Sequence, residues 1–116
     1  MANQSHILVV EDDPLICEVV IDALDGIYQT SRAETAAAAL EHLRAGGIDA
    51  MLLDCTLPGG IDPHLVPMAD ESGVPIILMS GHPDRVDSFP GVGRPFILKP
   101  FSLTALLDTI ERVVAT

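Results

Sequence analysis

Polar side chains that could do chemistry follow four short apolar segments of the sequence. In chain order they are Glu11, Asp12, Asp13, Asp54, Ser80 and Lys99. Clustered carboxylates repel one another unless a cation is near, and hard oxygen ligands with room for water suit Mg²⁺. A divalent cation beside Asp54 could hold phosphoryl oxygens, while Ser80 and the only lysine, Lys99, take the remaining ones. The set therefore favours phosphoryl transfer, for which a carboxylate nucleophile that forms an aspartyl phosphate is a known covalent strategy.

The pattern of the sequence predicts the elements that must bring these residues together. Short apolar runs predict strands at Ile7–Val10, Ile27–Ser31, Ile48–Leu53, Val74–Met79 and Phe96–Leu98. Amphipathic or capped stretches predict helices over residues 14–25, 34–45, 62–72 and 103–115. Asp62 is expected to cap the third of these helices and Ser102 the last. Residues 82–95 are rich in proline and glycine, so a shortened or irregular fourth helix is expected there.

Strands that alternate with helices predict an α/β fold with a doubly wound, five-stranded parallel sheet. The length suits one domain over residues 1–116. Because the carboxyl ends of parallel strands meet at one edge, the polar residues that follow the strands are expected to converge there.

Four segments, in register and in order, resemble the receiver domains of bacterial two-component response regulators. They are Ile7–Asp13, Met51–Asp54 with Pro58 four residues on, Ile77–His82, and Leu98–Phe101. The resemblance covers nearly the whole chain. It implies a CheY-like receiver domain with the flavodoxin-like strand order 2-1-3-4-5. A stand-alone, single-domain response regulator is expected.

The resemblance also implies how a phosphoryl group is taken up. Asp54 would accept it from a phosphohistidine on a sensor histidine kinase or a histidine phosphotransfer protein. Asp12 and Asp54 would bind Mg²⁺ (or Mn²⁺) directly, the backbone carbonyl of Thr56 would add an oxygen, and Glu11 would act through water. Lys99 would pair with a phosphoryl oxygen.

Further residues would complete the switch. Ser80 would turn its hydroxyl toward the phosphoryl group, and Phe96 stands at the switch aromatic, where it lacks the hydroxyl of a tyrosine. Cys55 and Gly81 would contact the phosphoryl group. The output would be a change in binding to an unknown downstream protein.

Several residues have simpler interpretations. Asp13 precedes Pro14 and is favoured as a helix cap over a site residue. Cys17 is expected to face the core. Cys55 reads better as a small neutral loop residue than as a nucleophile, and His82 better as a loop residue than as a catalytic one.

Other functions remain open on the sequence alone. A phosphate sink and a receiver-like binding module that is not phosphorylated are both possible, although the intact set of Asp12, Asp54, Ser80 and Lys99 argues against the second. A phosphohydrolase of the haloacid dehalogenase type needs a second aspartate two residues after Asp54, where this chain has Thr56. We therefore expect a phosphorylation-controlled signalling domain and not an enzyme with an outside substrate.

Composition and charge set outer limits. The 116 residues include 17 acidic and six basic ones, for a net charge of −11. Nucleic acids and anionic membranes are bound through cationic patches, so neither is expected as a partner. No apolar run approaches the roughly 20 residues of a membrane span, and the N-terminus does not resemble a signal peptide. The two cysteines lack metal-site spacing, which favours reduced thiols and a cytoplasmic location.

Overall fold

The computed structural model describes residues 5–55, 64–81 and 94–114. Within them, five parallel strands form one sheet in the order β2-β1-β3-β4-β5. The strands are β1 His6–Val10, β2 Gln29–Ala33, β3 Ala50–Asp54, β4 Ile76–Ser80 and β5 Phe96–Leu98. The predicted flavodoxin-like sheet is thereby confirmed.

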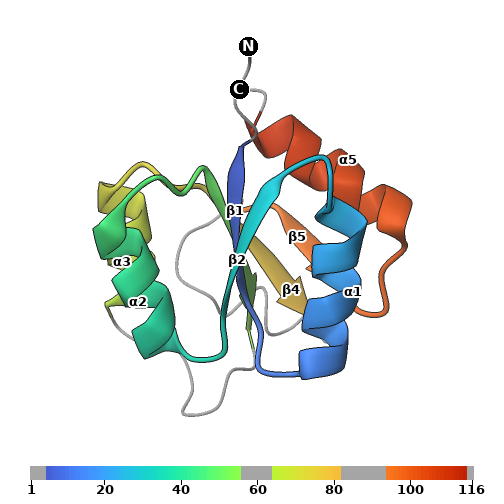
Figure 1. Cartoon of the computed structure of the whole chain (residues 1–116), viewed down its shortest axis with the longest axis horizontal. Helices are drawn as coiled ribbons and strands as arrows, with labels where there is room; N and C mark the ends of the chain where they lie inside the picture. Colours follow the sequence, from blue (N-terminus) through green and yellow to red (C-terminus); the bar gives the residue numbers. More distant parts are fainter. Residues whose placement is uncertain (1–4, 56–63, 82–93, 115–116) are drawn as a thin grey trace.

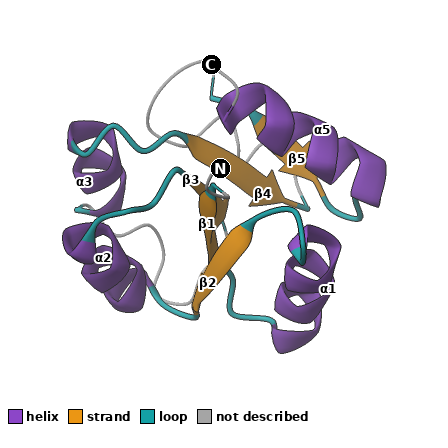
Figure 2. Ribbon diagram, turned by 45° about the horizontal axis from the view of Figure 1, so that its top comes forward, coloured by secondary structure: helices purple, strands orange, loops and turns teal. Residues whose placement is uncertain are grey.

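Helices cover both faces of the sheet (Figure 1). They are α1 Pro14–Leu24, α2 Ala36–Ala45, α3 Leu65–Glu71 and α5 Leu103–Val114. Figure 2 shows α1 and α5 on one side of the strands and α2 and α3 on the other. The predicted irregular fourth helix falls mainly in residues 82–93, which lie outside the described residues. No described helix combines the length and the apolar character needed to cross a membrane.

The two faces of the sheet build two apolar cores because successive side chains of a strand point to opposite sides. Ile7 and Val9 of β1 pack with α1 and α5, whereas Leu8 and Val10 pack with α2 and α3. Strands covered on both sides should be apolar throughout, and all five residues of β3 and of β4 are buried. The central strands are therefore held firmly from both faces.

Three predicted strands begin two residues too early in the chain. Ile27 and Tyr28 both donate their backbone N–H groups to the carbonyl of Leu24, so they close the end of α1, and β2 begins two residues later than predicted. Val74 likewise donates to the Ala69 carbonyl at the end of α3, and β4 begins only at Ile76. Apolar residues that periodicity assigns to strands thus form turn hydrogen bonds at the ends of the preceding helices. The third strand also starts at Ala50 and not at residue 48.

Short polar side chains begin three of the helices. Asp13 caps α1 through Leu15 N–H at 2.9 Å, and Ser102 caps α5 through Ala105 N–H at 3.0 Å. Thr35 caps α2 through Ala38 N–H, so the helix begins at Ala36 rather than at residue 34. Asp62, the predicted cap of the third helix, lies outside the described residues. The residue at the N-cap of α3 is His64, which makes no side-chain cap hydrogen bond.

We expect the core contact of α5 to set much of the stability. Leu106 is fully buried, and replacing it with alanine should lower the free energy of unfolding by about 2–5 kcal/mol. Leu103 lies in the same helix but is 50% exposed, so Leu103→Ala should change stability by no more than about 0.5 kcal/mol. Urea unfolding of both variants tests this, and equal losses would contradict the assigned packing of α5.

Candidate functional site

Three carboxylates meet at the carboxyl edge of the sheet. Val10 and Leu53 are paired in the register of β1 and β3, so the residues that follow them, Glu11 and Asp54, emerge side by side. Ligand oxygens of Glu11, Asp12 and Asp54 all lie within 4.8 Å of one another. Glu11 and Asp54 are buried, whereas Asp12 is exposed. Such a hard oxygen set could hold a divalent cation.

An ammonium group joins this cluster from the far end of the sheet. Lys99 directly follows β5, and its backbone N–H donates to the Ser80 carbonyl at the end of β4. Its Nζ lies 2.7 Å from Oε1 of Glu11 and 3.5 Å from Oδ1 of Asp54. The predicted convergence of Glu11, Asp12, Asp54 and Lys99 is therefore confirmed.

The direct ion pair between Glu11 and Lys99 is a feature that the sequence reasoning missed. The two residues are 88 positions apart, and their shared place at strand ends predicts proximity but not which carboxylate the ammonium contacts. The second oxygen of Glu11 accepts a hydrogen bond from the Asp12 N–H at 3.2 Å. Both oxygens of this carboxylate are thus engaged inside the protein.

Burial and charge set the protonation of this pair. Burial, followed by the contact with Asp54, raises the pKa of Glu11 to about 7, although Lys99 acts in the opposite direction. Burial lowers the pKa of Lys99, but the hydrogen bond to Glu11 and the negative charges of Asp54 and Glu11 outweigh burial and raise it. The ammonium therefore stays charged at neutral pH, while Glu11 titrates there.

The predicted site residues at the end of β4 and in β5 differ in their exposure to solvent. Ser80 is fully buried as the last residue of β4, which pairs with β3, the strand that ends at Asp54. Gly81 is exposed, and a Cβ there would meet no heavy atom within 4 Å, so packing does not explain the glycine. Phe96 is 51% exposed at the start of β5, two residues before the strand end.

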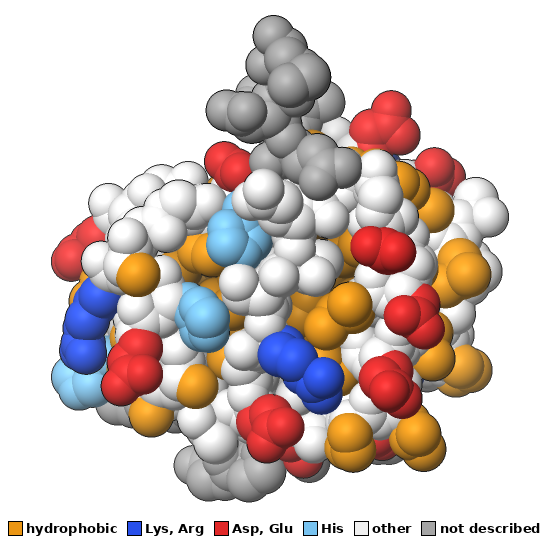
Figure 3. Space-filling model, viewed as in Figure 1, with side chains coloured by type: hydrophobic (Ala, Val, Ile, Leu, Met, Phe, Trp, Pro, Cys, Tyr) orange, Lys and Arg blue, Asp and Glu red, His pale blue; other side chains and the backbone are white. Residues whose placement is uncertain are grey.

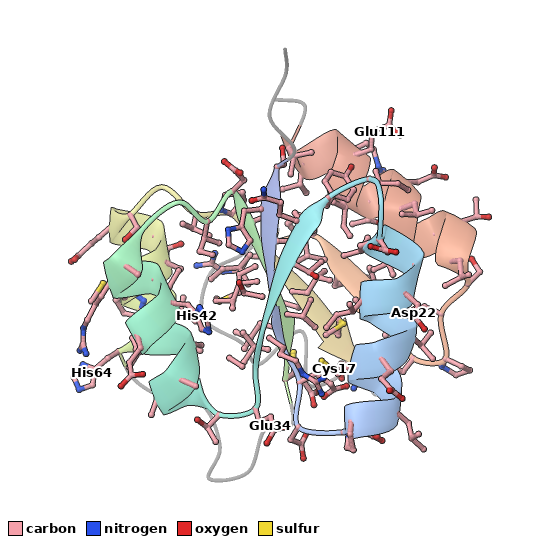
Figure 4. The ribbon with its side chains drawn as sticks, in the orientation of Figure 1. Cys17, Asp22, Glu34, His42, His64 and Glu111 are labelled. Atoms are coloured by element: carbon pink, nitrogen blue, oxygen red, sulfur yellow. The ribbon has the colours of Figure 1, made fainter. Side chains whose placement is uncertain are left out.

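The structure describes three of the four remaining residues that the sequence analysis singled out. Cys55 is buried, and its N–H donates to the Met79 carbonyl. Thr56 lies outside the described residues. Asp13 is the helix cap that was favoured. Cys17 is 1% exposed in the core under α1, as predicted, on the sheet side of the helix in Figure 4.

An apolar groove opens beside Lys99. Its volume is about 420 Å³, and its lining comprises Leu15, Ile16, Val19, Lys99, Pro100 and Phe101. Leu15 is 71% and Val19 52% exposed, although both are apolar and lie one turn apart on α1. The four-residue spacing of Leu15 and Val19, on the side of α1 away from its buried residues, is the sequence signal that could have predicted this exposed apolar surface. Two larger cavities, of about 510 and 530 Å³, have no lining residue in common with the carboxylate cluster.

Acidic side chains lie on α1, which contributes three residues to the lining of this groove. Glu18 and Asp22 lie on the exposed side of α1, and Figure 3 shows acidic and apolar side chains interspersed over the α1 and α5 side of the molecule. Asp22 points outward from α1 in Figure 4. The α1 helix contains no basic residue. The exposed charged residues of α1 are therefore all acidic.

The titration of Glu11 makes the stability of the metal-free protein depend on pH. Its pKa of about 7 lies above the ordinary 4.5, so between these values the folded state binds more protons than the unfolded chain. The stabilisation from Glu11 is complete below pH 4.5 and is lost as the pH rises through about 7, by at most about 1.4 kcal/mol per pH unit. In EDTA, the free energy of unfolding of wild type relative to Glu11→Gln should therefore fall from pH 5 to 7.5.

Urea unfolding at a series of pH values measures this difference. Glu18→Gln makes the same change at an exposed position of α1 and should follow the wild type throughout. Parallel curves for wild type and Glu11→Gln would show that Glu11 keeps an ordinary pKa.

Comparison with known proteins places this architecture and site in a family. The family model described as the response regulator receiver domain matches residues 7–111. The chain is 37% identical to the transcriptional regulatory protein CseB of Streptomyces coelicolor, over 98% of this chain and 51% of the relative. It is 38% identical to the DNA-binding response regulator MtrA of Mycolicibacterium smegmatis, over 93% of this chain and 50% of the relative.

These relatives overturn the expectation that nucleic acid is no partner. MtrA is described as DNA-binding and CseB as a transcriptional regulator. The chain spans about half the length of both. The net charge of −11 belongs to these 116 residues alone, so it cannot exclude a ligand that a longer protein binds through other residues. The exclusion was therefore wrong.

Solved structures show the same fold. A response regulator receiver protein from Sinorhizobium medicae aligns with a TM-score of 0.86 at 19% identity, over 97% of this chain and 96% of that one. The BeF₃-activated conformation of SdrG from Pseudomonas melonis aligns with a TM-score of 0.81 at 31% identity, over 98% of this chain and 99% of that one. From its sequence match and its fold together, the chain belongs to the response regulator receiver domain family.

Proposed function

We propose that this receiver domain takes a phosphoryl group from a phosphohistidine onto Asp54 and thereby switches its binding to other proteins. The observation that carries the proposal is the placement of Asp54, a buried carboxylate with an ammonium 3.5 Å away on one side and two further carboxylates within 4.8 Å. A nucleophile, a cation-binding set and a fixed positive charge are what such a transfer needs. The domain is a switch that acts on itself and not an enzyme for an outside substrate.

The carboxylate set fits Mg²⁺ or Mn²⁺. Hard oxygen donors with one exposed member leave room for water and phosphoryl oxygens, which is the coordination that Mg²⁺ prefers. Asp12 and Asp54 would hold the ion directly, with Glu11 acting through water and the Thr56 carbonyl adding a backbone oxygen. When bound, the ion supplies positive charge that neutralises the developing phosphoryl charge.

The chain's own residues perform the transfer. A carboxylate oxygen of Asp54 attacks the phosphorus, the new P–O bond forms as the P–N bond to histidine breaks, and the imidazole leaves with that electron pair. The Lys99 ammonium pairs with a phosphoryl oxygen and offsets its negative charge. The Ser80 hydroxyl then turns toward the phosphoryl group, while Gly81 leaves the approach open. Later attack of water on phosphorus would restore Asp54.

The groove beside Lys99 is where the phosphoryl donor would dock. It includes Lys99 of the site and presents exposed Leu15 and Val19 on α1, whose exposed charged residues are the acids Glu18 and Asp22. A sensor histidine kinase or a histidine phosphotransfer protein that places an apolar surface with basic neighbours here would match both features. Phosphotransfer from the kinases of the source organism would identify it.

Asp54→Asn should abolish phosphorylation. The amide is a far weaker nucleophile than the carboxylate, so incubation with acetyl phosphate and Mg²⁺ should add a phosphoryl group to wild type only, as measured by intact mass. Beryllofluoride, the activator named for the SdrG structure, should perturb the NMR spectrum of wild type and not of the variant.

Asp49→Asn is the matched control, because Asp49 precedes the other end of the same strand and accepts a hydrogen bond from His6 N–H. It should be phosphorylated like wild type. An unchanged response in Asp54→Asn would move the acceptor elsewhere. Many phosphate ions released per protein from small phosphoesters would favour the phosphohydrolase instead.

Mg²⁺ should raise the melting temperature of wild type, because it binds the folded carboxylate cluster and not the unfolded chain. At a tenfold excess over Kd the gain is about 1.4 kcal/mol, which corresponds to several degrees. Asp12→Asn should remove most of the gain, whereas Asp13→Asn, which changes the neighbouring cap outside the cluster, should keep it. Scanning calorimetry with and without Mg²⁺ measures both, and equal gains would remove Asp12 from the metal site.

A further inference from the structure

An ion pair far from the carboxylate cluster joins β5 to α3. The two terminal guanidinium nitrogens of Arg94 donate to the carboxylate of Asp70, Nη1 to Oδ1 at 3.1 Å and Nη2 to Oδ2 at 2.8 Å. The hydrogen bond to Arg94 lowers the pKa of Asp70, so this carboxylate is ionised at neutral pH. Two parallel bonds fix the direction of the guanidinium as well as its distance, which a single contact between charges does not.

The side chains of β5 are buried on one face of the sheet only. Ile97, the middle residue of the strand, is 5% exposed in the core with α1 and α5. Phe96 and Leu98 point to the opposite face, because side chains alternate along a strand, and they are 51% and 40% exposed. On the α3 side, the ion pair with Asp70 therefore supplies a restraint that no buried side chain of β5 supplies.

The strand leads directly from this pair to the site. The Pro95 carbonyl, next to Arg94, accepts a hydrogen bond from Leu78 N–H at 2.9 Å. At the other end of β5, Lys99 N–H donates to the Ser80 carbonyl at 2.8 Å. Only three strand residues separate the two ends. An extended segment this short passes a displacement of one end on to the other, so the place of Arg94 bears on that of Lys99.

We propose that Arg94 and Asp70 are positioning residues that set the place of Lys99 in the site. The ion pair fixes the amino end of β5 against α3, and the strand then carries the ammonium to the carboxylates at the opposite edge of the sheet. Without the pair, Lys99 would occupy a wider range of positions and would meet a phosphoryl oxygen on Asp54 less often. This inference rests on the proposed function and adds to it two residues outside the site.

The size of the effect follows from the kind of ion pair. Pairs between exposed side chains contribute little unless their geometry is favourable, as in a bidentate pair of arginine and carboxylate. Here the contact is bidentate and the Arg94 side chain is 17% exposed, whereas that of Asp70 is 50% exposed. Loss of the pair should therefore change the reactivity of the site by about two- to fivefold and should not abolish it.

The position of Lys99 can be followed directly, because it is the only lysine of the chain. Protein labelled with ¹³C at lysine Cε gives one side-chain NMR signal, recorded here in EDTA at a fixed pH. Asp70→Ala and Arg94→Gln should each move this signal from its wild-type position toward that of the urea-unfolded protein. The double variant should move it no further, because each change removes the same contact. Arg94→Lys keeps the charge without the two parallel bonds and should give a smaller movement.

Three controls separate position from charge and from stability. Glu71→Ala removes the neighbouring exposed charge of α3, and Arg44→Gln removes an exposed guanidinium at the end of α2. Both should leave the lysine signal at its wild-type position. Leu40→Ala weakens the core under α2, which packs against α3, β1 and β2. It should lower the melting temperature and leave the signal in place, whereas a signal that follows overall stability alone would move.

Phosphorylation kinetics give the functional readout. With acetyl phosphate and Mg²⁺, intact mass should show Asp54 labelled about two- to fivefold more slowly in Asp70→Ala and in Arg94→Gln than in wild type. Glu71→Ala should be labelled at the wild-type rate. The gain in melting temperature from Mg²⁺ should be the same in all of these proteins, because none of the changes removes a carboxylate of the cluster.

Either of two results would overturn the inference. One is a lysine signal that stays at the wild-type position in both Asp70→Ala and Arg94→Gln, or that moves as far in Leu40→Ala. The other is labelling of both variants at the wild-type rate. Labelling of the wild type keeps the two proposals apart. If wild type is labelled, an adverse result defeats only the role of Arg94 and Asp70, whereas absent labelling of wild type defeats the proposed function whatever the lysine signal shows.

Discussion

The rest of the structure depends on an electrostatic imbalance at the carboxyl edge of the sheet. Glu11, Asp12 and Asp54 lie within 4.8 Å of one another, and Lys99 is the ammonium that offsets them. Folding must hold these like charges together against their repulsion. The parallel register of β1 and β3 holds them together, because pairing of Val10 with Leu53 fixes Glu11 and Asp54 side by side at the strand ends. Positive charge lowers the free-energy cost of this repulsion. The site is therefore suited to bind a cation, and with the cation an anionic group.

Apolar packing holds the charged residues in place. The two cores on opposite faces of the sheet bury every residue of β3 and β4, so the backbone that carries Asp54 and Ser80 is confined from both sides. Close packing of this kind resists displacement at the level of a single methylene group. The reactive groups themselves stand at the ends of the strands, where packing stops and solvent begins. Rigid support and an accessible edge are thus produced by one arrangement.

Sequence patterns predicted the architecture and the membership of the site well, for physical reasons. Apolar strands that alternate with helices permit few topologies, and strand ends must meet in a parallel sheet. The patterns failed where local hydrogen bonds compete, as at Ile27 and Val74, which close helices instead of opening strands. They also could not show that Lys99 contacts Glu11 more closely than Asp54. Lys99 and Glu11 are 88 positions apart, and no local sequence pattern determines the distance between two such side chains. The charge argument failed on nucleic acid because it treated one segment's charge as that of a whole protein.

The shortness of β5 has a consequence for how the site behaves over time. The strand has three residues, and among the described strands it pairs only with β4, so few backbone hydrogen bonds hold it. Elements of this kind open locally at a lower free energy than a central strand, and hydrogen exchange registers them first. Lys99 follows this strand, while Glu11 and Asp54 follow the central pair. Brief fraying of the sheet's edge would therefore separate the ammonium from the carboxylates while the rest of the molecule stays folded.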